Sequence, residues 1–286
     1  MQLSPTRSTE LLAVIGVIAV LMGACSTSSS HLARARIGSA SVSEHGALLF
    51  ADEFNGDAVD WQRWNRCHWW GPTGCTIAGN HELQWYLPNQ VDQRNGSLRM
   101  TAVRRPTRSP DGTDYAYRSG MITTGRDSSD LRVKPKFVFR YGYLETRARV
   151  PRGAGLWPAL WLLPASNRSL PEIDILEVRG SQTRKASMHL HTRDRSGKEV
   201  SLGEHWAGVD LAVGWHVFAL DWRSGSLRWL VDGTESWRVT GRQVPSEPMY
   251  FVANLAVGGD WPGRPTARTP FPATFELDYV KVWKAR

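Results

Sequence analysis

From Ala47 to its end the chain consists of short apolar or alternating segments separated by turn residues. Alternation of apolar and polar positions is typical of strands, because successive side chains point to opposite faces. The segments are GSLRMTAVRR, KFVFRYGYLETRARV, ALWLLP, EIDILEV, HVFALDW, SLRWLVDG, MYFVANLAV and ATFELDYVKVW. Turn sequences such as NG, DG and PRGAG bound them, and none keeps a helical period. The pattern predicts an all-β sandwich or jelly roll.

The start of the chain has a different pattern. Residues 11–24, LLAVIGVIAVLMGA, form an apolar run that follows Arg7 and ends in small residues, as an export signal does. The run is short for a membrane span. The sequence LMGAC resembles a bacterial lipoprotein box, in which Cys25 would carry the lipid; simple secretion and an uncleaved anchor are the alternatives. We therefore expect an export signal over 1–24, a polar tether over 25–46 and one folded domain over 47–286, outside the cytoplasm.

Composition and charge narrow the class of protein. Hydrophobic residues make up 41% and charged residues 22% of 286, as in ordinary globular proteins. The formal net charge is +8, but the basic residues are scattered along the chain rather than gathered in a run. This scatter argues against a nucleic-acid partner, although attraction to an acidic envelope polymer remains open.

The cysteines favour a disulfide over a metal site. If Cys25 carries a lipid, Cys67 and Cys75 remain, and they close the short loop CHWWGPTGC. We expect them to be paired in an oxidising compartment, with two free thiols as the alternative. No second Cys or His pair lies at the spacing that a zinc site requires.

The segment PEIDILEV, residues 171–178, contains three acids among apolar residues. In a regular strand Glu172 and Asp174 share a face, whereas Glu177 points to the other. One extra residue, a β-bulge at about Ile175 or Leu176, would return Glu177 to the face of the other acids. The same bulge would leave one of those two residues on the buried face. A helix would instead spread the acids around its circumference.

Catalysis explains these acids better than stability does, because three like charges on one strand face repel one another. A merely solvated strand face is the alternative. Retaining glycoside hydrolysis uses two carboxyls about 5 to 5.5 Å apart, one a nucleophile and one a general acid that its surroundings keep protonated. A third acid can share a proton with them. The triplet therefore predicts catalysis, and retaining glycoside hydrolysis is a chemistry that needs such carboxyls.

The tryptophans support a carbohydrate substrate. The chain has 14 of them, and indole faces stack on the apolar faces of sugar rings. Trp157 and Trp161 lie four residues apart, on one strand face just before the acidic segment. Burial is the alternative for any one of these rings. Six together predict the lining of a groove: Trp69, Trp70, Trp85, Trp157, Trp161 and Trp261.

Several motifs occur in an order that we know from one family. GLWPALWLLP precedes EIDILE, with NHELQWY and YGYLETRARVP upstream and GWHVFALDW, WLVDG and NLAVGGDWPG downstream. From about Phe50 to Trp283 the chain thus resembles glycoside hydrolase family 16, in particular its laminarinase-like endo-β-1,3-glucanase branch. The resemblance implies a jelly roll of two antiparallel sheets with a concave substrate cleft. It also implies that Glu172 is the nucleophile, Glu177 the acid/base and Asp174 the assisting acid.

The resemblance extends to further positions. It places His189 among the catalytic residues, hydrogen-bonded to the assisting carboxylate or to substrate; a satisfied sheet histidine is the alternative. His191 has the same strand parity but no equally clear counterpart. Sugar contacts are implied for Asn80, Glu82, Asn254 and Trp261, besides Trp157 and Trp161. No catalytic cofactor is implied. Many relatives hold a structural calcium ion, and its ligands here would be Glu53, Asp278 and the Gly96 carbonyl, with exposed acids at strand ends as the alternative.

Substrate specificity is less well defined by the sequence. Met121 stands where laminarinase-like relatives often carry an arginine. The bulged acidic motif disfavours mixed-linkage glucan and xyloglucan specialists, whose acidic run is one residue shorter. We expect a monomeric, retaining endo-β-1,3-glucanase whose only link to a membrane is the N-terminal lipid. The alternatives are an envelope-polysaccharide transglycosylase, a galactan hydrolase of the same family, and a non-catalytic glucan-binding protein, which the retained acids disfavour.

Overall fold

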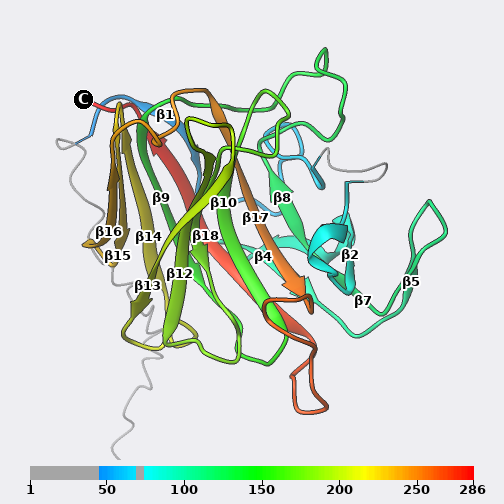
Figure 1. Cartoon of the computed structure of the whole chain (residues 1–286). Coiled ribbons are helices and arrows are strands. Elements are labelled where there is room, and N and C mark those ends of the chain that lie inside the picture. The colour runs from blue at the N-terminus through cyan, green and yellow to red at the C-terminus, as the bar shows by residue number, and fades with distance from the viewer. Residues whose placement is uncertain (1–44, 69–73) are drawn as a thin grey trace, which may run out of the picture. The chain divides into compact units, whose positions relative to one another are not determined.

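Two large antiparallel sheets form the structure, which is a computed structural model that describes residues 45–68 and 74–286 (Figure 1). The predicted export signal, Cys25, most of the predicted tether, Trp69 and Trp70 lie outside the described residues. The all-β jelly-roll prediction is confirmed. Among the described residues the only helices are two short 3₁₀ turns, η1 (Ala78–Asn80) and η2 (Pro88–Gln90). None of the described helices is long and apolar enough to cross a membrane.

The first sheet has eight strands. Its order is β16 (Thr234–Thr240), β15 (Ser226–Val231), β14 (His216–Arg223), β9 (Gly142–Arg149), β18 (Ala273–Trp283), β4 (Ser97–Ala102) and β3 (Val91–Arg94), and β1 (Leu48–Asp52) also pairs with β18. In β15 the alternation is regular, because Leu227, Trp229 and Val231 are buried while the residues between them are half-buried. One face of this sheet therefore packs on the core.

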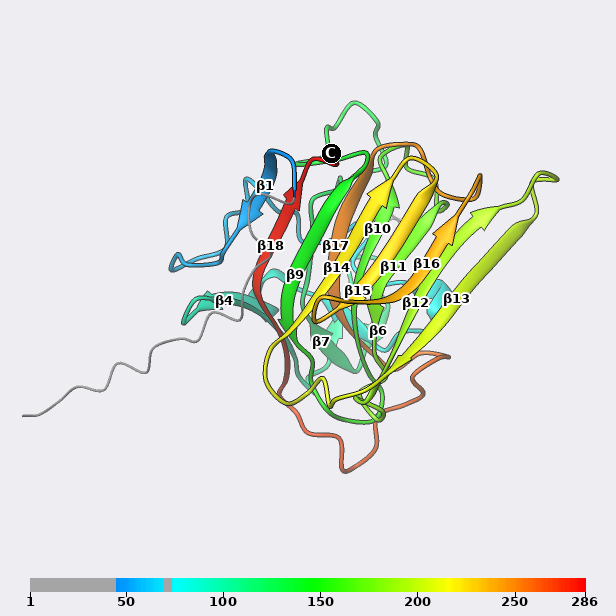
Figure 2. The same ribbon diagram turned by 90° about the vertical axis from the view of Figure 1, so that its left-hand side faces the viewer.

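The second sheet has six strands and carries the acidic segment. Its order is β13 (Glu199–Ala207), β12 (Lys185–Arg193), β11 (Glu172–Glu177), β10 (Leu156–Pro164), β17 (Met249–Val257) and β8 (Met121–Thr123). Figure 2 shows β10 to β13 side by side, with the β12–β13 hairpin at the edge. Strand β17 is buried along its whole length. The acidic strand β11 thus lies near the middle of the sheet, between β10 and β12.

Two small strand pairs complete the structure. They are the parallel pair β2 (Gln84–Tyr86) and β7 (Tyr117–Ser119), and the antiparallel pair β5 (Thr107–Arg108) and β6 (Asp114–Tyr115). The first pair is anchored to the second sheet, since the Gln84 Oε1 accepts a hydrogen bond from the Val257 N–H at 2.6 Å. The NHELQ segment is thereby held beside the C-terminal end of β17.

A tryptophan ties the two sheets together at the acidic strand. Trp229, on β15 of the first sheet, is fully buried, and its Nε1–H donates to the backbone oxygen of Asp174 at 2.9 Å. Around it the core contains the apolar side chains of β11 and of the residue that follows it, namely Ile173, Ile175, Leu176 and Val178. Because a buried backbone oxygen without a partner is costly, this bond helps to fix where β11 bends.

Candidate active site

The β-bulge predicted in the acidic strand is confirmed. On one side Asp174 pairs with Trp161 and Leu176 with Leu160, so Ile175 has no residue opposite it in β10. On the other side the register with β12 also shifts between Asp174 and Glu177. The extra residue changes the parity of the strand, and Glu177 returns to the face of Glu172 and Asp174.

The buried face of β11 differs from the prediction in one respect. Ile175 is 1% exposed and Leu176 is 0% exposed, and both belong to the core. The expectation that only one of them would be buried is wrong, because the two consecutive residues of a bulge take the place of one. Two apolar side chains therefore hold the bulge in the core.

The acids line one cleft together with most of the predicted sugar-binding residues. The cleft has a volume of about 160 Å³. Its walls come from the NHELQ segment and from strands β10, β11 and β17. The lining residues are Ile77, Asn80, Glu82, Trp157, Ala159, Trp161, Glu172, Asp174, Glu177 and Asn254. Positions up to 177 residues apart in the chain thus meet around three carboxyls.

Burial and mutual repulsion set the charge of these carboxyls. Asp174 is 4% exposed and is hydrogen-bonded to Glu172. Burial raises the pKa of Glu172 well above its ordinary value, and the charges of Asp174 and Glu177 add to that effect. Burial, and then the charge of Asp174, also raises the pKa of Glu177. Burial and repulsion thus favour the protonated forms of Glu172 and Glu177.

Two histidines of β12 each contact a different acid of β11. His189 Nδ1 lies 2.7 Å from Glu177 Oε2 and 3.9 Å from Asp174 Oδ2. His191 Nε2 lies 3.1 Å from Asp174 Oδ2. His189 therefore does not form the expected hydrogen bond with the assisting carboxylate, while the alternative contact with substrate stays a prediction. His189 is opposite Asp174 in the sheet, but the bulge brings Glu177 within its reach and leaves Asp174 to His191.

The hydrogen bonds favour the charged forms of both imidazoles. The bond to Glu177 raises the pKa of His189, and the bond to Asp174 raises the pKa of His191, each against the opposing effect of burial. His191 had no assigned role in the sequence analysis. However, His191 follows His189 by two residues on β12, so its side chain was expected to point to the same face of the strand.

Comparison with known proteins fits this geometry. Residues 81–281 match the family described as glycosyl hydrolases family 16. The chain belongs to this family. Glycosyl hydrolases of family 16 act with retention of configuration, which requires a nucleophile and an acid/base.

Several known proteins resemble the chain over most of its length. A glucan endo-1,3-beta-glucosidase A1 of Niallia circulans is 33% identical over 83% of this chain and 38% of its own. A glucan endo-1,3-beta-glucosidase of Cryptopygus antarcticus is 32% identical over 84% of this chain and 93% of its own. The X-ray structure of an endo-beta-1,3-glucanase from Pyrococcus furiosus matches with a TM-score of 0.73 and 32% identity, over 84% of this chain and 94% of that one. The chain thus spans well under half of the N. circulans relative.

A chain of hydrogen bonds supports one wall of the family 16 cleft. The Trp161 Nε1–H donates to Asn254 Oδ1 at 2.8 Å, and Asn254 Nδ2 donates to the Tyr86 hydroxyl at 2.9 Å. That hydroxyl donates to Glu82 Oε2 at 3.3 Å, and Asn80 Nδ2 donates to Glu82 Oε1 at 3.3 Å. Burial raises the pKa of Glu82 to about 7. The wall is therefore fixed before any ligand binds, and one of its groups titrates near neutrality.

The tryptophans of the predicted groove have different roles. Trp157 is half-buried, donates its Nε1–H to Glu177 Oε1 at 3.1 Å, and packs against Trp261 with ring centroids 5.2 Å apart. Trp161 is 5% exposed and lines the cleft from beneath. The prediction for Trp85 is wrong, because this ring is 4% exposed and packs against Tyr115 outside the cleft. Trp261 does not line the acid cleft itself but lies against it through Trp157.

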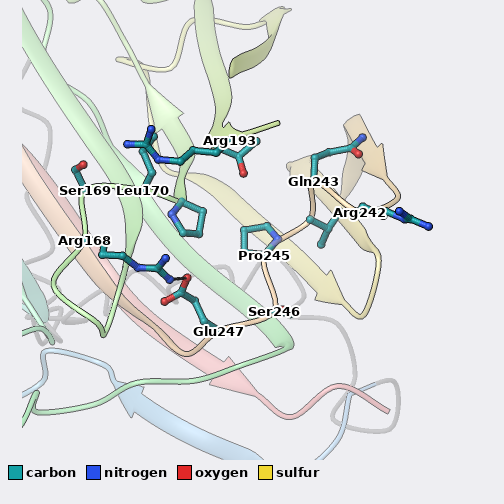
Figure 3. Close-up of a pocket in the computed structure, with 12 residues that line it drawn as sticks. Arg168, Ser169, Leu170, Arg193, Arg242, Gln243, Pro245, Ser246 and Glu247 are labelled. Carbon is teal, nitrogen blue, oxygen red and sulfur yellow. Dashed lines mark hydrogen bonds and ion pairs between the residues drawn. The ribbon is translucent and has the colours of Figure 1, made fainter. Parts of the chain in front are cut away.

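A larger cavity lies near the start of β11, but it takes no part in this chemistry. It has a volume of about 430 Å³, and Figure 3 shows Arg168, Arg193 and Arg242 around it. None of the three acids of β11 lines it. Arg168 forms an ion pair with Glu247, as the dashed line in Figure 3 shows, and Arg193 Nη2 lies 2.7 Å from Glu199 Oε1. The acid cleft is therefore the candidate active site.

The residues expected to bind calcium do not fit that ion. Glu53 Oε1 lies 2.6 Å from Lys281 Nζ, and Asp278 Oδ2 lies 2.7 Å from Arg147 Nη1. Gly96 lies in the turn between β3 and β4. An ion ligated by both carboxylates would lie beside two basic groups that already neutralise them. We therefore derive no role for calcium in this chain.

One group of described residues could hold another metal ion. The ligand atoms of Asp174, His189 and His191 lie within 4.8 Å of one another. Both histidines are already hydrogen-bonded to carboxylates, which suits proton handling in a glycosidase.

The expected disulfide is present near the cleft wall. Cys67 and Cys75 are bonded with Cα atoms 4.8 Å apart, and the Cys75 carbonyl accepts a hydrogen bond from the Tyr86 N–H at 2.8 Å. The bridge thus steadies the segment that leads to the cleft wall.

Proposed function

We propose that this family 16 domain is a retaining endo-β-1,3-glucanase. The observation that carries the proposal is the bulge at Ile175, which puts Glu172 and Glu177 in one cleft while each keeps different partners. The similarity to endo-1,3-beta-glucosidases at 32–33% identity supports β-1,3-glucan as the substrate class.

The reaction needs two steps with named residues. Glu172 attacks the anomeric carbon and forms a glycosyl ester, while the bond from that carbon to the leaving oxygen breaks and Glu177 gives its proton to this oxygen. Glu177, now a carboxylate, then takes a proton from water as the water oxygen bonds to the anomeric carbon. The ester bond breaks and frees Glu172. Two inversions give net retention.

The surroundings of Glu177 suit an acid that later acts as a base. Burial raises its pKa, which keeps it protonated for the first step. The Trp157 Nε1–H and His189 Nδ1 lie at hydrogen-bond distance from its two oxygens. When Glu177 has lost its proton, donation from both groups stabilises the carboxylate for the second step.

Asp174 assists by holding a proton that Glu172 must lose. Glu172 can attack only as a carboxylate, although burial raises its pKa. Asp174 is hydrogen-bonded to Glu172 and lies 3.1 Å from His191 Nε2. When the shared proton lies on Asp174, the Glu172 carboxylate is free to attack. His189 and His191 are positioning residues in this scheme.

The cleft wall formed by the NHELQ segment and β17 binds the sugar whose anomeric carbon reacts. Asn80, Glu82 and Asn254 offer polar groups to sugar hydroxyls, and Trp157 offers a ring face. Met121, which stands at the position of an arginine in many laminarinase-like relatives, is 1% exposed and pairs with Asn254 across β8 and β17. An apolar side chain therefore lies beside Asn254 and Trp161 at this position.

Incubation with laminarin, mixed-linkage glucan, agarose and carrageenan tests the proposal. We expect shortened oligosaccharides from laminarin whose new reducing ends are β anomers at first, as proton NMR can follow. The Glu172→Gln variant should yield none, while the exposed Glu199→Gln on β13 serves as a charge-matched control that keeps activity. Shortened products from a galactan alone would contradict the substrate. Products longer than the starting oligosaccharides would replace hydrolysis by glycosyl transfer.

A further inference from the structure

A second pocket adjoins the acid cleft on the side of β12 and β13. Its volume is about 180 Å³, and of the three acids only Glu177 lines it. Its remaining walls come from the β11–β12 turn, the two edge strands of the six-stranded sheet and the segment after β17. They are Arg179, Gln182, Lys185, Ser187, His205, Trp206, Ala207 and Trp261. We call this space the Glu177 pocket.

The Glu177 pocket lies on the leaving-group side of the cleft, if the proposed function is right. The sugar attacked by Glu172 must occupy the cleft that contains both Glu172 and Glu177. The leaving oxygen must lie at Glu177, and the sugar attached to it continues beyond that residue. The pocket that contains Glu177 without Glu172 therefore receives the leaving sugar.

The pocket combines a sugar-stacking ring with positive charge. Trp261 is half-buried, so part of its ring surface is open, whereas Trp206 pairs with Ala186 and packs against the core. Lys185 and Ser187 alternate along β12 with the same parity as His189 and His191, which puts them on the cleft face. Across the sheet Lys185 pairs with Ala207, and Ser187 with His205. The Trp261 ring and these polar groups thus face the same space.

The positive charge in the pocket has no acidic partner. The Arg179 guanidinium lies 5.2 Å from the Trp261 ring centroid, and its Nη2 donates to the Gln182 amide oxygen at 3.1 Å. Both contacts orient Arg179 but leave its charge uncompensated. Within the described residues neither Arg179 nor Lys185 forms an ion pair, and the pocket contains no carboxylate other than Glu177. A neutral glucan has no group that needs two cations at this position.

We propose that the Glu177 pocket binds an anionic substituent, a carboxylate or a sulfate, on the sugar that follows the cleaved bond. Arg179 offers a planar set of donors that suits either oxyanion, and Lys185 adds a second charge. The preferred substrate is then an acidic β-glucan rather than a neutral one. This inference deepens the proposed function and gives a reason for two basic side chains beside the acid/base.

Binding to a variant that cannot cleave tests the pocket directly. Glu172→Gln is titrated with laminarin, partly carboxymethylated laminarin and partly sulfated laminarin of matched chain length. We expect the anionic probes to bind about threefold to tenfold more tightly than laminarin, as for two partly exposed ion pairs, and this ratio to shrink at high salt. The two anionic probes distinguish a carboxylate from a sulfate preference.

Two sets of substitutions decide whether the pocket is responsible. In the Glu172→Gln background, Arg179→Gln with Lys185→Gln should bring the ratio to about one. Arg195→Gln with Lys198→Gln removes the same charge from the exposed β12–β13 turn and should leave the ratio intact. Equal binding of all probes to Glu172→Gln, or an equal loss of the ratio in both double variants, would overturn the inference. Wild-type protein that fails to cleave laminarin would instead overturn the proposed glucanase, so the two failures are distinguishable.

Discussion

His189 Nδ1 lies 2.7 Å from Glu177 Oε2, although the sheet register places His189 opposite Asp174. This contact lowers the pKa of Glu177 against the larger raising effect of burial. Glu177 must be protonated in the first step of the proposed reaction, so loss of its proton sets the alkaline limb of the activity profile.

Replacing His189 should move that alkaline limb upward. His189→Phe removes the bond that favours the ionised form, so the pKa of Glu177 rises and the limb shifts to higher pH. His189→Gln, which can still donate a hydrogen bond, should give a smaller shift. The dependence of kcat/KM on pH for the three proteins measures this. A shift to lower pH, or an unchanged limb with a uniformly reduced rate, would contradict the assignment.

The two glutamates should respond differently to an added nucleophile. Glu172→Ala and Glu177→Ala should each lose on the order of 10²-fold to 10⁴-fold in kcat on laminarin. With azide, Glu172→Ala should form an α-glycosyl azide from an activated substrate, because azide attacks from the face that the carboxylate has left. Glu177→Ala should form the β-glycosyl azide, through the intact ester. The same azide anomer from both variants would contradict the division of roles.

Removing the bulge should abolish activity and weaken the fold. Deletion of Ile175 returns β11 to regular alternation, which turns Glu177 into the core and removes an apolar side chain that is 1% exposed. Burial of an unpaired acid costs several kcal/mol, and each kcal/mol corresponds to about 2–4 °C in Tm for a domain of this size. Ile175→Val keeps the bulge and should cost only about 0.5–1.5 kcal/mol. Thermal unfolding together with laminarin cleavage separates the two variants.

Stability should not depend on calcium. Since Lys281 and Arg147 pair with Glu53 and Asp278, Tm in EDTA and in excess calcium should be equal. Arg147→Met should lower the free energy of unfolding by about 1–3 kcal/mol, because it leaves the half-buried Asp278 carboxylate without this partner. A rise in Tm with calcium in the wild-type protein would contradict this and restore the metal site.

Cys25 should determine where the protein is found. The sequence predicts export with a lipid on this residue, and the positions concerned lie outside the described structure. Expressed in a bacterial host, the full chain should fractionate with membranes and take up labelled palmitate, and Cys25→Ser should do neither. Soluble export of the unaltered chain would favour simple secretion instead.

The arrangement of the acids was open to prediction because it depends on local parity. Side chains alternate in any strand, so the spacing of Glu172, Asp174 and Glu177 already required an irregularity near Ile175. The identity of the histidine partners depended instead on the register between β11 and β12, which one sequence does not specify. His189 was therefore assigned to the wrong carboxyl, and His191 had no assignment.

Long-range contacts limited the remaining predictions in the same way. Trp85 is in a segment rich in sugar-binding signals, yet the parallel pairing of β2 with β7 turns it away from the cleft. The basic partners of Glu53 and Asp278 come from β18 and β9, and no local pattern relates these residues to one another. The chain contains many basic residues, so ion pairs could take the place of a metal ion. The sequence did not show which basic residues would pair with Glu53 and Asp278.

The unpaired Ile175 has a consequence for how this enzyme class can change. A substitution alters a side chain but not the number of residues in a strand, so no single substitution converts the bulged acidic strand into the shorter form of the mixed-linkage and xyloglucan enzymes. That change requires the loss of one codon from the middle of a buried strand, which also shifts every contact to one side of it. Directed evolution by point mutation alone would therefore change the subsites around the acids but would keep the bulged form of the acidic strand.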